Sequence, residues 1–176
     1  MRYDEFYKAV EANEGGYQND PDDKGNAGKG TIYGIAYKYF PYDFLACYSL
    51  YKQGKIKEAK EYAKKFYYNK FYNPLYDKIH NEQLAFKIFD LSVNLGKTTT
   101  IKLLQTALNK YGDLRIADDG VFGDYTLKAV NYAPDDFYNR FIMLVEEHYE
   151  RKAKLGRNKK FLFGWLNRLK KIFKGE

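Results

Sequence analysis

Apolar residues recur at helical spacing in two segments of the first half of the chain. Both segments, 3–13 and 56–71, place an apolar residue at every third or fourth position, which is the period of an amphipathic helix. Acidic residues in its first turn support the first helix, and Asn73-Pro74 ends the second, because proline cannot continue a helix. We predict a helix in each. The apolar positions are Phe6, Tyr7 and Val10 in the first, and Ala59, Ala63, Phe66 and Tyr67 in the second.

The second half of the chain shows the same period in three further segments. Asn81 is placed to cap a helix that ends at Gly96, and threonines 98–100 are placed to cap the next one, which predicts a helical hairpin. A long helix is predicted near the end of the chain, after a turn at residues 118–120. The apolar positions are Leu84, Ile88, Leu91 and Leu95, then Ile101, Leu104 and Leu108, then Phe137, Phe141, Leu144 and Val145.

Between the first two predicted helices the periodicity is lost. Gly15 and Gly16 stop the helix, and the chain up to Thr31 is so rich in glycine, asparagine and aspartate that we predict a loop or an irregular hairpin. Residues 31–40 suit either a strand or the start of a helix, and the pattern does not decide. The predicted fold class is mainly α, a single compact domain with an irregular or small β region near the N-terminus. The predicted seam lies near residues 78–82.

Composition narrows the kinds of site that the chain can hold. With 19 Tyr and 13 Phe in 176 residues, the chain is suited to surfaces that grip flat, amphipathic ligands, of which sugars are one class. Cys47 is the sole cysteine, so no intramolecular disulfide forms, and we expect it to be buried. The two histidines stand in unrelated contexts. We therefore expect neither a metal site nor another cofactor.

Positive charge is concentrated at the C-terminal end. Residues 151–176 hold ten Lys and Arg against one acid, whereas the first 150 residues hold 20 against 22. Such a segment attracts polyanions in general, including nucleic acid, anionic lipid and anionic wall polymers, and the charge alone does not choose among them. Trp165, with Lys170 and Lys171, fits contact with anionic wall polymer, or a capping amphipathic helix with a solvated basic face. The sequence shows no common nucleic-acid-binding signature, and we expect no nucleic acid partner.

Glu14 is the first candidate for acid–base chemistry. It closes the first predicted helix, where the negative end of the macrodipole disfavours the ionised carboxylate and raises its pKa. Enclosure by Tyr17 or Tyr33 acts in the same direction. A glutamate that is protonated near neutral pH is what a glycosidase needs to protonate a leaving oxygen. The local pattern alone also fits a solvated residue at a helix end.

Further polar residues follow at positions that suit a substrate cleft. Glycoside hydrolysis commonly needs a second carboxylate, or a carboxylate and a hydroxyl that hold the attacking water. Each loop acid by itself also fits ordinary turn chemistry. Asp90 and Asn94, four residues apart, share a helix face that points into a cleft or ties the helix to the N-terminal loop. The loop candidates are Asp20, Asp22, Asp23 and Thr31.

The segment around Asp119-Gly120 has two interpretations. It is a turn in which Val121 and Phe122 fill the core, or it takes part in binding peptide or glycan.

Short blocks spread over most of residues 5–170 together form a recognisable pattern. They are Glu14–Tyr17, Asn19–Pro21, Gly28–Thr31, Tyr33–Ile35, Phe71–Leu75, Phe89–Gly96, Asp119–Gly123 with Thr126-Leu127, and Gly164–Arg168. In this order they resemble glycoside hydrolase family 108 and the predicted peptidoglycan-binding segment associated with it. The N-terminal blocks are similar to that family's EGGY motif, Asp-Pro loop and Gly-x-Thr-x-x-Gly-Ile segment. Residues 24–29 depart from it, with KGNAGK in place of a shorter, glycine-paired stretch.

The resemblance implies a lysozyme-like, mainly helical fold and a muramidase that cleaves the β-1,4 bond between N-acetylmuramic acid and N-acetylglucosamine. Carried over position by position, it makes Glu14 the general acid and Thr31 a hydroxyl that positions water. The Asp-Pro motif favours Asp20 as the second carboxylate, ahead of Asp23, which analogy with phage-type lysozymes suggests. Tyr17, Tyr33, Asp90 and Asn94 are the expected substrate-binding residues.

The resemblance also frames the organisation and setting of the protein. It implies a catalytic part in residues 1–80 and a peptidoglycan-binding part in 81–176, packed as one unit, with peptidoglycan glycan strands as the partner of a monomer. The N-terminus lacks the apolar run of a signal peptide, and no stretch reaches a membrane-spanning length. We expect synthesis in the cytoplasm, holin-assisted or specialised release to the wall, and no stable membrane insertion.

Three other functions compete with the muramidase. Nucleic-acid binding by the basic C-terminal segment is opposed by the missing signature and by the confinement of the charge to one end. A non-catalytic wall-binding or secretion-assisting protein would tolerate the loss of Glu14, whereas an enzyme would not. A lytic transglycosylase also uses one catalytic glutamate but forms an anhydro product, which the product mass reveals.

Overall fold

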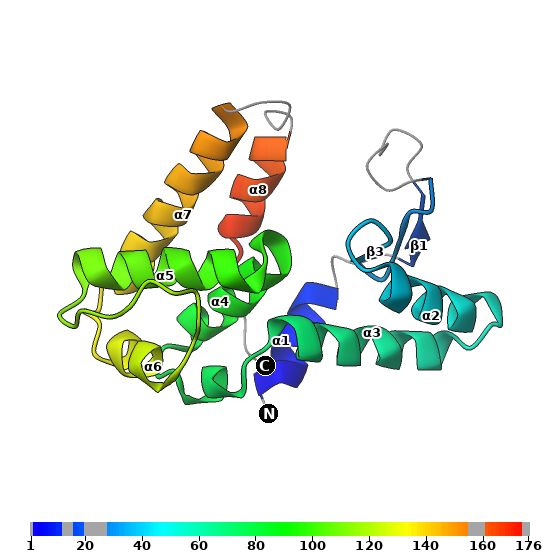
Figure 1. Ribbon diagram of the computed structural model, residues 1–176, viewed down its shortest axis with the longest axis horizontal. Helices are drawn as coiled ribbons and strands as arrows, with labels where there is room; N and C mark the ends of the chain where they lie inside the picture. Colours follow the sequence, from blue (N-terminus) through cyan, green and yellow to red (C-terminus); the bar gives the residue numbers. More distant parts are fainter. Residues whose placement is uncertain (1, 12–15, 20–27, 155–160, 174–176) are drawn as a thin grey trace. The chain divides into compact units, whose positions relative to one another are not determined.

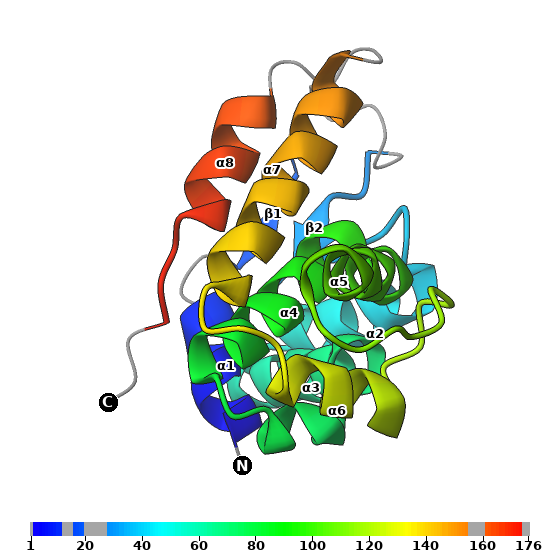
Figure 2. The ribbon, with the colours of Figure 1, turned by 90° about the vertical axis from the view of Figure 1, so that its left-hand side faces the viewer.

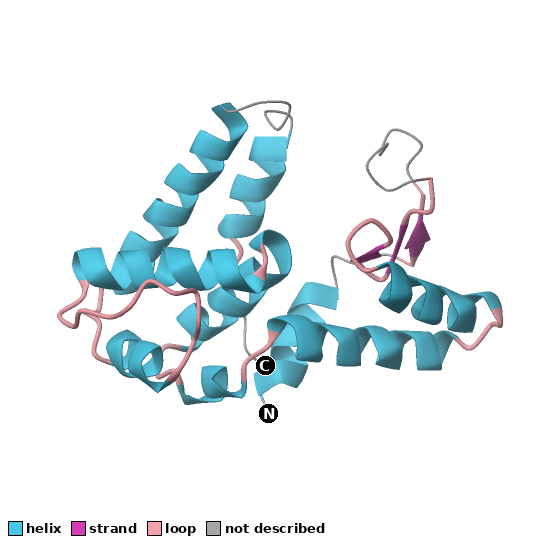
Figure 3. Ribbon diagram, viewed as in Figure 1, coloured by secondary structure: helices cyan, strands magenta, loops and turns pink. Residues whose placement is uncertain are grey.

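Helices make up most of the described chain. The computed structural model describes residues 2–11, 16–19, 28–154 and 161–173, and in these ranges the strands are confined to a small sheet near the N-terminus (Figure 3). The predicted mainly α class with a small β region is therefore confirmed. By contacts the chain divides into two compact units, Met1–Tyr72 and Asn73–Glu176. The division into functional parts at residues 80 and 81 stays a prediction.

The first unit is built around α1 (Arg2–Glu11) and α3 (Ile56–Phe71), which have the helical periodicity that the sequence predicts. The buried face of α1 carries its predicted apolar residues and also Tyr3. Tyr3 donates a hydrogen bond from its hydroxyl to the carbonyl oxygen of Lys64 on α3, and Asp4 pairs with the Lys64 ammonium at 2.6 Å. These contacts hold the first helix against the third.

Three short antiparallel strands settle the undecided segment after residue 30. They are β1 (Tyr17–Gln18), β2 (Thr31–Ile32) and β3 (Ile35–Ala36), in that order across the sheet. The turn between β2 and β3 is made by Tyr33 and Gly34, both with positive φ, at 44° and 75°. Two positive φ values are typical of the tight hairpin turn that matches strand twist, and glycine supplies one of them at little cost.

The periodicity analysis missed α2 (Pro41–Lys52), which lies beside the strands and α3 (Figure 1). Proline begins this helix, where its fixed φ is already helical and its missing N–H costs nothing. The helix buries Phe44 and Cys47 and presents polar and aromatic residues elsewhere, so no strong apolar stripe marks it in the sequence. The expectation that Cys47 is buried is confirmed.

The second unit has α4 (Glu82–Leu95) and α5 (Lys97–Tyr111) as its central hairpin. The Asn81 side chain caps α4 by accepting from the Leu84 amide at 3.0 Å, as predicted. The predicted cap by threonines 98–100 is wrong: α5 already begins at Lys97. Gly96, with φ of 85°, ends one helix and starts the next, which leaves the threonines inside the helix.

Further helices complete the second unit. A short 3-10 helix, η2 (Pro74–Lys78), precedes α4, and α6 (Asp124–Asn131) follows the predicted turn. The predicted long helix is α7 (Phe137–Lys154), which lies alongside α8 (Leu162–Leu169) (Figure 2). Among the described helices, none is long and apolar enough to cross a membrane.

Candidate functional site

Three of the four predicted catalytic residues, Glu14, Asp20 and Asp23, lie outside the described residues. Glu14 precedes Gly16 by two positions, and Asp20 directly follows Asn19. The chain therefore joins these candidates to β1 and its flanking residues, whose structure is described.

Thr31 lies in β2 at the root of the loop that carries the aspartates. It pairs with Gln18 of β1 on one side and with Ala36 of β3 on the other. The Asn19 side chain donates to the carbonyl oxygen of Gly28 at 3.1 Å, so the described residues that flank the loop are tied together. The Thr31 side chain is half-buried. Its position beside both ends of the loop is compatible with the predicted role of holding water.

The position next to Thr31, occupied by Gly30, requires a glycine. Its φ is 80°, a region that side-chain-bearing residues rarely adopt. A Cβ atom there would lie 2.1 Å from the Gln18 carbonyl oxygen, which is backbone and has little freedom to move. The close approach of the strands at Thr31 therefore depends on the absence of a side chain at residue 30.

Four tyrosines, which we call the tyrosine row, run from β1 to the β2–β3 turn by way of α2. Ring centroids lie 4.8 Å apart for Tyr17 and Tyr48, 6.4 Å for Tyr48 and Tyr51, and 6.3 Å for Tyr51 and Tyr33. A Cβ placed on Gly16 would lie 4.0 Å from Tyr51 Cε2. The row therefore borders the EGGY segment. Tyr17, Tyr48 and Tyr51 are each half-buried, so part of each ring meets solvent.

Tyr33 differs from the other members of the row because it is buried. Its carbonyl oxygen accepts from the Tyr67 hydroxyl at 3.3 Å, and its ring meets Tyr51 edge-on. Burial raises the pKa of the Tyr33 phenol, with smaller contributions from Cys47 and Tyr51. These contacts suit a buried residue that packs against Tyr51 and holds the tyrosine row in place. Its predicted binding to substrate stays a prediction.

The sequence reasoning identified Tyr17 and Tyr33 but missed Tyr48 and Tyr51. The available signal was a helical one: Phe44, Tyr48 and Tyr51 are spaced by four and three, and their rings stack in sequence along α2. Recognising that spacing as functional requires knowing that α2 lies beside the strands.

Asp90 and Asn94 lie in the second unit and contact other helices of that unit. Asp90 is 2% exposed, and its Oδ1 accepts from Arg168 Nε of α8 at 3.0 Å. The Lys87 ammonium lies 3.9 Å from Asp90 Oδ2, and Asn94 donates to the Tyr149 hydroxyl of α7 at 2.9 Å. The two residues do share a helix face, as predicted. Their contacts favour a structural role, and substrate binding by them stays a prediction.

Burial dominates the electrostatics of this cluster. It lowers the pKa of Lys87, opposed by the negative charge of Asp90. The pKa of Tyr149 is raised, first by burial and then by Asp90. Ion pairs removed from water in this way are sensitive to the loss of either partner.

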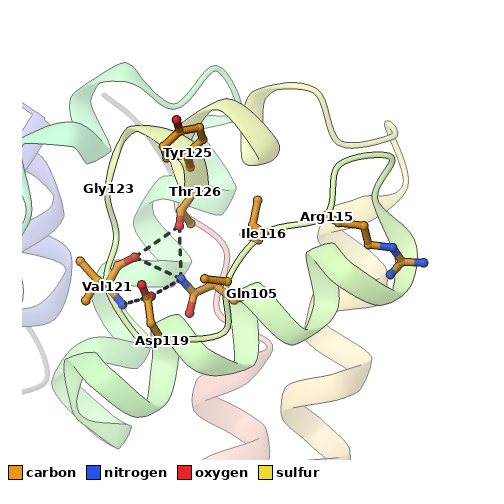
Figure 4. Close-up of a pocket in the computed structure, with 9 residues that line it drawn as sticks. Gln105, Arg115, Ile116, Asp119, Val121, Gly123, Tyr125 and Thr126 are labelled. Atoms are coloured by element: carbon orange, nitrogen blue, oxygen red, sulfur yellow. Dashed lines mark hydrogen bonds between the residues drawn. The ribbon is translucent and has the colours of Figure 1, made fainter.

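A pocket of about 280 Å³ opens beside the Asp119-Gly120 turn of the second unit (Figure 4). The buried Gln105 amide donates to Asp119 Oδ1 at 2.8 Å and to the Val121 carbonyl oxygen at 3.1 Å, and accepts from the Gly120 amide at 2.8 Å. The Val121 amide, followed by the Gln105 side chain, lowers the pKa of Asp119. The turn is thus fixed from inside the unit.

The predicted core role of this turn is half right. Phe122 is buried, with its ring edge-on to Tyr76 at 5.0 Å, whereas Val121 is exposed. Exposed Tyr125 and Val121 line the pocket together with Arg115, whose guanidinium points away from the Gln105 cluster (Figure 4). Apolar walls with a carboxylate at one side give the pocket the character of a binding site for an amphipathic ligand.

No group of three or more His, Cys, Asp or Glu residues in the described part of the chain is arranged to hold a metal ion.

Two family models match the chain in succession, and they meet between residues 96 and 99, whereas the contacts divide the chain after Tyr72. The family model described as Glycosyl hydrolase 108 matches residues 7–96, and the model described as Predicted Peptidoglycan domain matches residues 99–170. Among curated proteins, none matches. A solved structure titled "Structure of Brucella abortus SagA" is similar over 95% of this chain and 88% of that chain, with a TM-score of 0.66 and 24% identity. At that identity the likeness shows the fold alone.

Proposed function

Because the chain belongs to glycosyl hydrolase family 108, a family of lysozyme-like peptidoglycan hydrolases, we propose that it is an active muramidase. The bond it cleaves is the β-1,4 linkage between N-acetylmuramic acid and N-acetylglucosamine. The observation that supports the proposal is that Gly16 and Tyr17, the described residues of the EGGY segment, lie beside the tyrosine row, and that β1 pairs with the strand that holds Thr31.

Glu14 is the proposed general acid. It follows α1 and precedes Gly16, which lies beside Tyr51. A general acid must hold a proton near neutral pH so that it can donate it to the leaving glycosidic oxygen. Asp20, with Asp23 as the alternative, is the proposed second carboxylate, and the Thr31 hydroxyl helps to hold the attacking water.

The tyrosine row is the proposed sugar platform. A pyranose ring has an apolar face of C–H groups and a rim of hydroxyls, which matches the apolar face and polar edge of tyrosine. Tyr17, Tyr48 and Tyr51 are half-buried and fixed by contacts with one another, so they lose little conformational freedom when a glycan binds. We therefore add Tyr48 and Tyr51 to the proposed substrate-binding residues.

Peptidoglycan is the partner that the second family match supports for residues 99–170. The pocket beside Asp119 is the described cavity of this segment that combines apolar walls with a carboxylate. We propose that it contacts the wall polymer while the first unit cleaves the glycan. Binding without cleavage, as in a secretion-assisting protein, is the competing function, and the same match would accommodate it.

Digestion of purified peptidoglycan separates the two functions. We expect the wild type to release reducing ends and soluble muropeptides, and Glu14→Gln to bind the same material without cutting it. Glu11→Gln is the matched control, because Glu11 lies on α1, three residues away, in a half-exposed pair with Lys60 at 3.8 Å. It should cut like the wild type.

The outcomes are distinguished by mass and by sedimentation. Reducing muropeptides from the wild type and from Glu11→Gln, with none from Glu14→Gln, support the muramidase and its acid together. Anhydro products would instead show that the chain is a lytic transglycosylase and not a hydrolase. If no variant cuts and all sediment with the wall, the chain is a binding protein.

A further inference from the structure

Two bulky apolar side chains are exposed on α8 and just beyond it, beside polar Asn167 on the exposed side of the helix. Phe163 is 76% exposed, and Ile172, just beyond the helix, is 68% exposed. Phe163, half-exposed Leu166 and Lys170 stand at spacings of three and four, so they form one stripe along the helix. We call Phe163, Leu166, Lys170, Lys171 and Ile172 the α8 face.

The opposite side of α8 is firmly anchored. Its Trp165 stacks on Tyr149 of α7 with ring centroids 5.3 Å apart, and the ammonium of Lys152 lies 5.3 Å from the Trp165 ring. The two helices run side by side in both views (Figures 1 and 2). Among the described residues, the amphipathic helix therefore packs within the unit through the side that carries Trp165, and the residues of the α8 face are exposed or half-exposed.

Buried Lys87 and half-buried Gln83 of α4 fix the end of α8 and the residues that follow it. The Lys87 ammonium donates to the carbonyl oxygens of Leu169 at 2.9 Å and Lys171 at 2.8 Å. The Gln83 side chain bonds both the amide and the carbonyl of Phe173, and the Phe173 ring is buried against Phe86. The exposure of Phe163 and Ile172 is thus not the fraying of a loose terminus.

The surroundings of the α8 face are basic. Lys170 and Lys171 belong to it and are exposed, and α7 ends nearby with Arg151, Lys152 and Lys154 in its last turn. Residues 151–176 hold ten Lys and Arg against one acid. Exposed apolar and cationic side chains therefore occur together along α8 and in the residues that follow it.

We propose that the α8 face is a docking surface for an anionic lipid bilayer. Phe163, Leu166 and Ile172 enter the boundary between headgroups and acyl chains, and Lys170 and Lys171 meet the lipid phosphates. The helix lies on the membrane and does not span it. This inference goes beyond the proposed cleavage of peptidoglycan and does not depend on it.

The apolar residues single out lipid among the polyanions that positive charge attracts. A nucleic acid or an anionic wall polymer binds lysines favourably through counterion release. It has no hydrocarbon region in which isoleucine and leucine side chains could be buried away from water. A bilayer interface binds both the lysines and the apolar side chains favourably, and each cation near an anionic surface contributes roughly 1 kcal/mol of binding free energy. The composition of the α8 face fits the bilayer best.

Trp165 makes a direct test possible because it is the sole tryptophan of the chain and lies on α8. The full chain is mixed with vesicles that contain phosphatidylglycerol, or with vesicles of phosphatidylcholine alone, and bound protein is separated by flotation. We expect binding to the anionic vesicles only, weakened by salt. Brominated acyl chains in those vesicles should quench Trp165 emission.

Two double variants separate the contributions. Lys170→Glu with Lys171→Glu should weaken binding to anionic vesicles by roughly 30-fold or more, since at least two surface cations are lost. Phe163→Ser with Ile172→Ser should weaken it about tenfold or more while keeping every charge. Matched controls on α5 and α6, Tyr125→Ser and Lys110→Glu with Lys128→Glu, change equally exposed residues and should bind like the wild type.

The proposal is overturned if the wild type does not float with anionic vesicles. The melting temperature first confirms that the apolar variant is folded. The proposal is also overturned if this variant binds the vesicles as well as the wild type does and duplex DNA competes with the vesicles. The segment would then be a general polyanion binder. Since no peptidoglycan is present, failure of Glu14→Gln to abolish cleavage leaves this result unaffected.

Discussion

At the scale of single residues, the tyrosine row ties the packing of the first unit to its proposed chemistry. Tyr17 contacts both Phe44 and Tyr48, so a ring offered to a sugar is also part of the contact between β1 and α2. An aromatic pair of this kind contributes about 0.5 to 1.5 kcal/mol beyond its buried area. Removing a member of the row should therefore affect both substrate binding and stability, in proportions set by its exposure.

Tyr48→Ala and Tyr51→Ala should each weaken the apparent affinity for peptidoglycan about tenfold, as the loss of one stacking ring implies, and lower stability by about 1 to 2 kcal/mol. The measurement is the initial rate of peptidoglycan solubilisation against substrate concentration, beside a denaturant melt. Tyr42→Ala is the control, because Tyr42 lies on the same helix and is 87% exposed outside the row. Equal losses from all three variants would exclude a sugar platform at the row.

The limits of residue-level prediction are physical. Tyr17 and Tyr33 stand within the EGGY and Gly-Ile segments, so the local motif points to them. Tyr48 and Tyr51 become candidates only once α2 is folded against the strands, since their closeness to Gly16 and Tyr17 spans more than 30 residues of sequence. A local pattern carries no information on contacts that the tertiary fold creates.

At the scale of elements, the three-stranded sheet decides where the loop with the aspartates begins and ends. Its strands are only two residues long, so the pairing of Gln18 with Thr31 depends on a few contacts. Gly30 and Gly28 both have positive φ, at 80° and 68°, but only Gly30 faces backbone closely; Gly28 has open space where a Cβ would stand. The two glycines form a natural pair for testing the sheet.

Gly28→Ala should cost about 1 kcal/mol of stability, from backbone strain alone, and keep most of the activity. Gly30→Ala adds a clash with the Gln18 carbonyl and must part β1 from β2, so its cost should exceed that of Gly28→Ala by about 2 kcal/mol, with a loss of cleavage of tenfold or more. Thermal melts and muropeptide release check both. Similar behaviour of the two variants would show that the β1–β2 pairing does not position the site.

Element prediction succeeded where one sequence signal dominated. For α3 and α4, a strong apolar stripe agrees with a clear end signal, Asn73-Pro74 and Gly96 respectively. It failed for α2, whose buried face is narrow, and for the start of α5, where a positive-φ glycine replaced the expected threonine cap. The turn of the β2–β3 hairpin depends on a positive φ at Tyr33. This conformation is uncommon for a residue other than glycine, so the sequence does not predict it.

At the scale of the whole molecule, each unit is closed by contacts between segments far apart in the chain. In the second unit, Asp90 and Arg168 are 78 residues apart, and Gln83 and Phe173 are 90 apart. The sequence suggested a polar face at Asp90 and Asn94 but not its partners. These long-range bonds fix α8. The stability of the second unit and the proposed bilayer contact therefore both depend on them.

A comparison of buried and exposed ion pairs tests that dependence. The Asp90–Arg168 pair is buried on the aspartate side, whereas Asp136, just before α7, and Arg140 on α7 form a pair with both partners about half exposed, at 52% and 45%. Asp90→Asn leaves Arg168 and the buried Lys87 without their carboxylate and should lower the free energy of unfolding by about 3 kcal/mol or more. Asp136→Asn should cost at most about 1 kcal/mol, because water already screens that pair.

Denaturant melts measure both costs, and Trp165 emission follows the release of α8 from Tyr149 in the same samples. We expect Asp90→Asn to shift Trp165 emission to longer wavelength at denaturant concentrations at which the wild type stays folded, and to weaken vesicle binding in parallel. If Asp90→Asn is as stable as Asp136→Asn but loses peptidoglycan cleavage, the carboxylate acts on substrate, and the predicted cleft role of Asp90 replaces the structural one. Because the two substitutions make the same chemical change, the difference between them isolates the buried position.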